Sequence, residues 1–361
     1  MTSSPTDSEQ DFNDGLSLPS PYDTAPADEP WFLPPPPEGE AWQMPGPRVE
    51  RPVAVDVADW AAAEAGAGLV RAAVALARLD ERLRCSPGAT GLIRRLALEE
   101  AEALVRASGD RLPAGALALA VAQRGSGTEE DTRRLRAAAW AERRLLAALA
   151  TAPGGLGAFL GLQTVSNPAL GELAPRPGGI ELALAAEAWE AGLSALDAHP
   201  LTRAGFAHHL WRGLGLSLPE DMVESGTTAA LIGAEEARVL PFVPVALAGG
   251  GAHRAGGPAA ERLRAWYGGV ERGCLAALLS CERVSAWRAR AAARTADLQG
   301  RTVPRLLDAL AAAPLVSAAA AAVEAGCSRS AAERNLALLR DRGLVAELTG
   351  QSRFRLWRTR I

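Results

Sequence analysis

Residues 302–357 read TVPRLLDALAAAPLVSAAAAAVEAGCSRSAAERNLALLRDRGLVAELTGQSRFRLW, and this stretch decides how the C-terminal end of the chain folds. Its opening predicts a short helix that Thr302 caps and Pro314 ends. An alanine-rich second helix follows its cap Ser317 and closes at Gly326, a residue that adopts positive φ easily. Two short helices joined by a sharp turn are therefore expected.

A third helix follows directly and ends at Arg342, just before a glycine. Ser328 is one candidate cap for this helix. Ser330, with Glu333 three residues later, makes a rival capping box, so the start of the helix stays open by two residues. Glu333 could instead accept a hydrogen bond from a cytosine base, and we favour the capping role.

The residues after this helix alternate between apolar and polar side chains. Residues 344–348 and 353–357 flank a glycine-containing turn at 349–352, a pattern typical of a β-hairpin. Three short helices followed by a hairpin is the order of a winged helix-turn-helix. The sequence thus predicts a mainly α protein, a helical bundle followed by a C-terminal winged helix-turn-helix with a small β-hairpin at 300–361.

The helical period separates a core face of the third helix from an outward face. If Ala332, Leu336 and Leu339 face the core, a step of about 100° per residue places Ser330, Arg334, Ala337 and Asp341 outward. The N-terminal half of such a helix enters the major groove, and hairpin arginines meet phosphates. The predicted DNA-contact residues are therefore Arg329, Ser330, Arg334, Arg353, Arg355 and Arg358. The alternative is a winged helix used for protein contacts or dimerisation.

Charge is distributed unevenly along the chain, although the net charge is only −4. Residues 1–50 carry ten acids against one base, whereas residues 301–361 carry ten arginines against five acids. The two ends therefore have different partners. Double-stranded DNA is the expected partner of the basic end.

Residues 1–52 are rich in Pro, Asp, Glu and Ser, which predicts a disordered acidic arm. Trp31, Phe32 and Trp42 interrupt this composition. Such aromatic side chains either dock on a partner protein, dock on the arm's own domain, or stay unpaired in the tail. The sequence leaves these alternatives open.

Residues 53–299 alternate alanine- and leucine-rich stretches with Gly/Pro breaks, which predicts a helical domain. We expect this domain to form a homodimer or to bind a partner. Residues 236–258, rich in Gly and Pro, are predicted to be a loop or linker before the last long helix. The expected helices span 56–84, 88–108, 113–123, 128–151, 180–197, 201–214 and 259–298.

Four cysteines lie far apart without a CxxC pair, which suggests neither a zinc site nor a disulfide framework. His208 and His209 are adjacent and diverge on a helix, so they are not expected to share a metal. No apolar run reaches about 18 residues and no export signal is apparent. We therefore expect a cytoplasmic, nucleoid-associated protein without cofactor, metal or membrane contact.

The sequence resembles a bacterial family, of alphaproteobacterial type and unknown function, that joins a helical domain to a C-terminal helix-turn-helix. APLVS at 313–317 and LTGQSRFRLW at 348–357 carry most of the resemblance, and ARLDER at 77–82 with Ser86-Pro87 resembles the opening helix of that family. A more distant similarity runs to Fic-type proteins, some of which also join a helical domain to a C-terminal winged helix. The winged-helix pattern and its arginines predict a DNA-binding, transcriptional regulatory protein.

The Fic signature, His-Pro-Phe-x-Asp/Glu-Gly-Asn-Gly-Arg-x-x-Arg, has one counterpart here, HPLTRAGFAHHL at 199–210. His199 stands at the position of the general base that the resemblance implies. Arg203 replaces the metal-holding acid, Gly205 replaces the phosphate-binding asparagine, and Ala207 and Leu210 replace the two arginines. We therefore expect no enzyme activity. The competing hypotheses are Fic-type transfer of AMP to a protein and a non-catalytic protein-interaction module.

Overall fold

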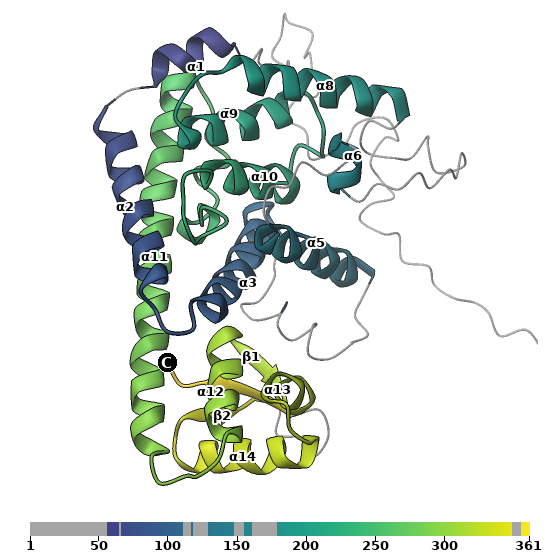
Figure 1. Cartoon of the computed structure of the whole chain (residues 1–361). Helices are drawn as coiled ribbons and strands as arrows, with labels where there is room; N and C mark the ends of the chain where they lie inside the picture. The colour runs from purple at the N-terminus through teal and green to yellow at the C-terminus, as the bar shows by residue number, and fades with distance from the viewer. Residues whose placement is uncertain are drawn as a thin grey trace, which may run out of the picture. The chain divides into compact units, whose positions relative to one another are not determined.

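A computed structural model of the 361-residue chain describes residues 56–64, 66–110, 117, 129–147, 155–160, 179–348 and 355–361. The described chain is mainly helical, with one small sheet near its C-terminus (Figure 1). The predicted acidic arm at 1–52 lies outside these residues, as does all of the predicted helix at 113–123 except Leu117.

The N-terminal two thirds of the described chain consist of helices and one short 3-10 turn. The sequence predicts most of these helices, and the structure confirms them to within a few residues. The predicted helix at 56–84 is in fact two helices, and α6 and α10 are not predicted. The elements are α1 (Val57–Ala63), α2 (Ala67–Arg84), α3 (Ala89–Ala107), α5 (Glu129–Leu146), α6 (Gly155–Leu160), α8 (Gly179–Ala195), α9 (Pro200–Gly213), α10 (Val223–Gly233), η1 (Ala246–Ala248) and α11 (Ala259–Arg294).

Helix α11 links the helical part to the C-terminal elements. Its 36 residues span about 54 Å at 1.5 Å per residue. Helix α2 runs parallel to it, because Arg71 pairs with Glu271 near the start and Arg82 donates to Ser285 further along (Figure 1). The C-terminal half of α11 extends beyond α2 and packs against α12.

The segment 236–258 is a loop, as the sequence predicts, but it is not an exposed linker. Phe242 and Val243 are fully buried. The Asp80 carboxylate on α2 accepts hydrogen bonds from the backbone N–H groups of residues 238, 239 and 240 at 2.8–3.0 Å. Glu100 on α3 accepts from the N–H groups of Ala246 and Leu247 at 2.7 and 2.9 Å. Two buried carboxylates therefore fix this loop inside the core.

The C-terminal elements form three helices and a three-stranded antiparallel sheet. The sequence predicts the helices and two of the strands, and the structure adds β1. Strand β3 lies between the other two, with Val316 and Glu347 both opposite Trp357. The elements are α12 (Thr302–Ala312), β1 (Leu315–Ser317), α13 (Ala318–Ala325), α14 (Arg329–Asp341), β2 (Val345–Glu347) and β3 (Leu356–Thr359).

The helix caps agree with the sequence in two cases and differ in one. The hydroxyl of Ser317 accepts from Ala320 N–H and caps α13, and Gly326 ends that helix with φ 61°. Ser328 caps α14 by accepting from the N–H of Ala331, which decides between the two predicted starts. Thr302 is not a cap. It is the first residue of α12, which has no side-chain cap.

Within the described residues no single helix is long and apolar enough to cross a membrane, and α1 and α2 meet that criterion only as a pair bent by 81°. The same residues contain no group of three or more His, Cys, Asp or Glu side chains arranged to hold a metal ion.

Candidate nucleic-acid interface

Helix α14 turns one face to the core and the opposite face to solvent. Ala332, Leu336 and Leu339 are fully buried, as the helical period predicts. Ser330 and Arg334 lie on the exposed side. The structure therefore presents the N-terminal half of this helix as an accessible polar surface.

Arg334 is the candidate residue with the greatest freedom to bind a ligand. It makes no hydrogen bond or ion pair with any residue that the structure describes, and its side chain is exposed. A guanidinium group in water loses little when it exchanges that water for a phosphate or a base edge. Arg334 is thus available for recognition without breaking an internal contact.

Arg329 is held only weakly. Its Nε lies 2.9 Å from Glu333 Oε1, one turn along the helix, and the two side chains are 62% and 47% exposed. An exposed pair at this spacing stabilises a helix by only about 0.3–0.5 kcal/mol. Glu333 therefore binds Arg329, whereas the sequence favours a capping role for it. Arg329 can leave this pair at small cost.

The hairpin arginines do not form one surface. Arg355 lies 3.5 Å from Glu347, and the same carboxylate lies 3.7 Å from Arg340 on α14. Arg358 is opposite Ala346 in the sheet, so it shares the face of Ala346 and not that of Glu347. The structure places Arg355 beside α14 and Arg358 on the other face. Arg353 lies outside the described residues.

Sequence reasoning missed Arg340, which lies at the far end of the predicted recognition helix. Its guanidinium binds Asp341 at 2.8 Å and lies 3.7 Å from Glu347, which also pairs with Arg355, so two arginines and two carboxylates meet between α14 and the hairpin. Only the strand register brings Arg340 and Arg355 together. In the sequence, Arg340 is indicated only by the arginines that gather before and after the predicted hairpin.

The C-terminal end of α14 is fastened to α11. Arg342 binds Asp297 through two nitrogens and thereby lowers the pKa of that carboxyl. Arg294 of α11 donates to the carbonyl oxygen of Arg342 at 2.8 Å, and the buried Trp287 donates to Leu344 at 2.9 Å. These contacts occupy the arginines at this end of α14. The opposite end, which carries Arg329 and Arg334, keeps its cations available.

The segment 199–210 has a structural role in the observed fold. His199 is the N-cap of α9, and its Nδ1 accepts from Leu201 N–H at 3.1 Å. Helix α9 begins at once with Pro200. A Cβ at Gly205 would lie 3.0 Å from the Trp266 ring, so glycine permits close packing of α9 on α11. An anion cradle needs exposed backbone N–H groups, and this segment buries its backbone within a helix.

Two histidines of α9, His208 and His209, and His253 from the loop 236–258 form a buried cluster. The rings of His208 and His209, and those of His208 and His253, have centroids 5.1 Å apart. Burial lowers the pKa of His208 to about 4 and the pKa values of His209 and His253 well below the ordinary range. These side chains are therefore neutral near pH 7, and they pack in the core.

No family model matches this chain, and no curated protein shows detectable similarity to it.

Proposed function

We propose that residues 302–361 form a winged helix-turn-helix and that the protein is a DNA-binding transcriptional regulator. The support is the order α12, β1, α13, α14, β2, β3, together with a sheet whose central strand is β3. In this arrangement α14 is the recognition helix, and the β2–β3 connection is the wing.

The exposed N-terminal half of α14 carries this proposal. Arg334 points outward and has no described partner, Arg329 has only a weak one, and Ser330 lies between them on the exposed side. In the major groove a guanidinium group pairs with the O6 and N7 atoms of guanine, and a hydroxyl accepts or donates to several bases. We assign base reading to Arg329, Ser330 and Arg334.

The hairpin would supply the phosphate contacts. Arg355 lies 3.5 Å from Glu347 and its side chain is 43% exposed, so its guanidinium can exchange this loose pair for a phosphate of the DNA backbone beside α14. Arg353 is assigned to the same role from the sequence alone. Arg358 faces away from this surface, so we leave it out of the proposed contact set.

Selection of genomic DNA fragments by the purified full-length protein at physiological salt tests the proposal. A regulator should enrich a small set of fragments that share a sequence. It should bind them at least a thousandfold more tightly than random DNA, as specific DNA-binding proteins do. Recovery of random fragments with no shared site, or no recovery at all, would contradict the proposal.

One observation favours protein contact as a second candidate function. Val323 on α13 is 81% exposed, and Leu348 after β2 is 47% exposed. Exposed apolar side chains suit a protein surface better than a phosphate backbone. If the selection fails, Val323→Ser in a search for binding proteins would test this alternative, because loss of a captured partner would assign the module to protein recognition.

A further inference from the structure

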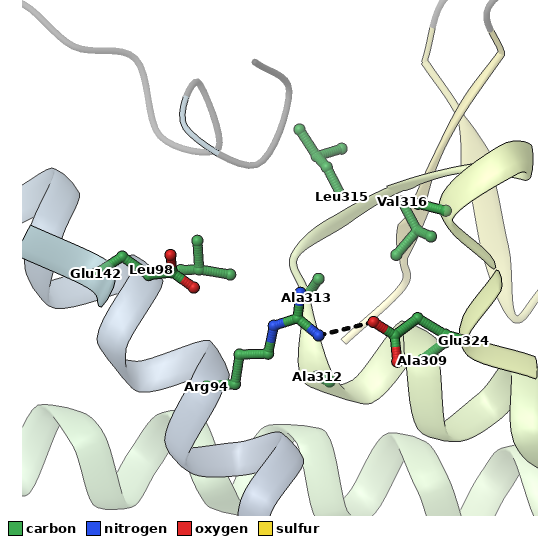
Figure 2. A pocket seen from close by; sticks show the side chains of 10 residues that line it. Arg94, Leu98, Glu142, Ala309, Ala312, Ala313, Leu315, Val316 and Glu324 are labelled. Carbon is green, nitrogen blue, oxygen red and sulfur yellow. Dashed lines mark hydrogen bonds and ion pairs between the residues drawn. The ribbon is translucent and has the colours of Figure 1, made fainter. Parts of the chain in front are cut away.

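A pocket lies between the helical part of the chain and the C-terminal elements (Figure 2). Helices α3 and α5 form one wall, and α12, β1 and α13 form the other. Its volume is about 120 Å³. The lining residues are Arg94, Leu98, Glu142, Ala309, Ala312, Ala313, Leu315, Val316, Ala320 and Glu324.

The pocket holds three charged side chains, and two of them neutralise each other. Arg94 on α3 reaches across to Glu324 on α13, with Arg94 Nη1 2.9 Å from Glu324 Oε1 (Figure 2). Glu142 on α5 lies on the same wall as Arg94 and makes no hydrogen bond or ion pair with the residues that the structure describes. Among the described residues Glu142 is therefore the one charged group of the pocket without a hydrogen bond or ion pair, although Arg94 and Arg143 lie near enough to act on it electrostatically.

Partial burial makes the ionised form of Glu142 less favourable than that of an exposed carboxylate. Partial burial raises the pKa of this carboxyl, while Arg94 and Arg143 act in the opposite direction. A partly buried carboxylate has lost hydration, and here the nearby arginines do not fully replace it. Such a carboxylate gains more from binding a cation than an exposed one does.

The remaining lining is apolar and small. Leu98 and Val316 are buried, Leu315 is partly buried, and the other side chains are alanines. At roughly 10–15 Å³ per water-sized group, a pocket of this volume admits on the order of ten such groups. The occupant must therefore be small, with an apolar body and a single charged end.

We propose that this pocket binds a small organic cation, an ammonium group on a short aliphatic chain, with Glu142 as its counter-charge. The aliphatic chain would lie against Leu98 and Val316, and Arg94 would stay engaged with Glu324. An anionic ligand would have to displace Glu324 from Arg94 and would also face the unpaired Glu142. The site does not depend on DNA binding, so the two proposals can fail separately.

Calorimetric titration of the full-length protein at pH 7.5 tests the site with three probes of matched size. The probes are n-butylamine, which is an ammonium ion at this pH, neutral n-butanol and the butanoate anion. Butylammonium should bind saturably, in the millimolar range expected of so small a ligand. It should bind at least tenfold more tightly than either of the other two probes.

The matched variants are Glu142→Gln, which removes the charge and keeps the shape, and Glu282→Gln on the exposed side of α11 as its control. Glu142→Gln should weaken butylammonium binding at least tenfold, and Glu282→Gln should leave it unchanged. Circular dichroism of both variants checks the fold. Saturable binding of butanoate in preference to butylammonium, equal binding by Glu142→Gln, or no binding of any probe would overturn the proposal.

Discussion

At the scale of single residues, two buried glycines, one on α11 and one on α10, show how closely the core is packed. A Cβ at Gly273 on α11 would lie 1.9 Å from the carbonyl oxygen of Pro244, a distance that no side chain tolerates. A Cβ at Gly226 on α10 would lie 2.4 Å from Leu104. The Pro244 contact is with backbone that buried carboxylates hold in place, so it cannot relax easily. Backbone contact at this point joins the loop 236–258 to α11.

Gly273→Ala should destabilise the protein by about 1–3 kcal/mol, the usual cost of forcing extra atoms into a packed core. Alanine is the better helix former by roughly 1 kcal/mol, so a net loss means that the clash with Pro244 outweighs propensity. Gly251→Ala is the matched control, because nothing lies within 4 Å of its Cβ position. Urea unfolding measures both variants. Equal stability of the two would contradict the close approach.

At the scale of elements, α14 depends on one cap. Ser328 accepts from Ala331 N–H at 3.2 Å, and Arg342 and Asp297 fix the other end of the helix. The carboxylate of Glu333 is occupied by Arg329. The start of the proposed recognition helix is therefore set by a single serine hydroxyl.

Ser328→Ala should cost about 1 kcal/mol, the typical loss for an N-cap serine. Ser330→Ala should change stability by less than about 0.5 kcal/mol, because Ser330 is an exposed residue of the first turn. Urea unfolding of the two single variants distinguishes them. A larger loss for Ser330→Ala would show that the capping box, and not Ser328, begins the helix.

The elements differ in how well the sequence predicts them, and the reasons are physical. A helix with an exposed polar face and a clear cap, such as α14, follows from periodicity alone. Helix α10 does not, because it is buried along its whole length and contains glycine and threonine, whose helix propensity is low. Tertiary packing stabilises it. Strand β1 is three residues long, and only its pairing with β3 defines it.

For the proposed interface, too, the sequence predicts some features and not others. The outward position of Ser330 and Arg334 follows from the helical period and agrees with the structure. Arg355 and Arg358 lie three residues apart, so the alternation of side chains along a strand puts them on opposite faces, whereas the face that meets α14 depends on strand register, which the sequence does not specify here. The pocket beside Glu142 depends on contacts between segments far apart in the chain, so no local pattern indicates it.

At the scale of the whole molecule, α11 connects the buried histidine cluster to the C-terminal elements. Trp266 on α11 stacks on His208, and Trp287, nearer the C-terminal end of the same helix, donates to the carbonyl oxygen of Leu344. Burial lowers the pKa values of the histidines and raises the pKa of Glu100. Stability should therefore depend on pH on both sides of neutrality.

Below pH 6.5 the unfolded chain protonates its histidines, whereas folded His208 stays neutral down to about pH 4. Acidification should therefore remove stability, at up to about 1.4 kcal/mol per pH unit for each buried histidine. Burial raises the pKa of Glu100 to about 8 from 4.5, so its stabilising effect is full below pH 4.5 and is lost as pH rises through 8. Because three histidines favour higher pH and one carboxyl favours lower pH, the free energy of unfolding should be greatest near pH 6–7.

The free energy of unfolding in urea, measured from pH 5 to 8.5, checks this optimum. Glu100→Gln, which cannot ionise, should flatten the decline between pH 7 and 8.5 and steepen the acid limb, where Glu100 otherwise offsets part of the histidine effect. Stability that stays constant from pH 7 down to 5 would contradict the neutral, buried state of the histidine cluster.

The proposal that α14 reads DNA is tested most directly by the affinity of Arg334→Ala for a selected fragment and for random DNA, at several salt concentrations. Loss of a bidentate base contact should cost about 1–3 kcal/mol on the selected fragment and much less on random DNA. Arg355→Ala should weaken both and make the slope of log affinity against log salt shallower by about one unit. Arg283→Ala, an exposed arginine on α11, is the control and should change neither. Equal affinity of Arg334→Ala and the unaltered protein on the selected fragment, or no salt-dependent binding by either, would contradict the account.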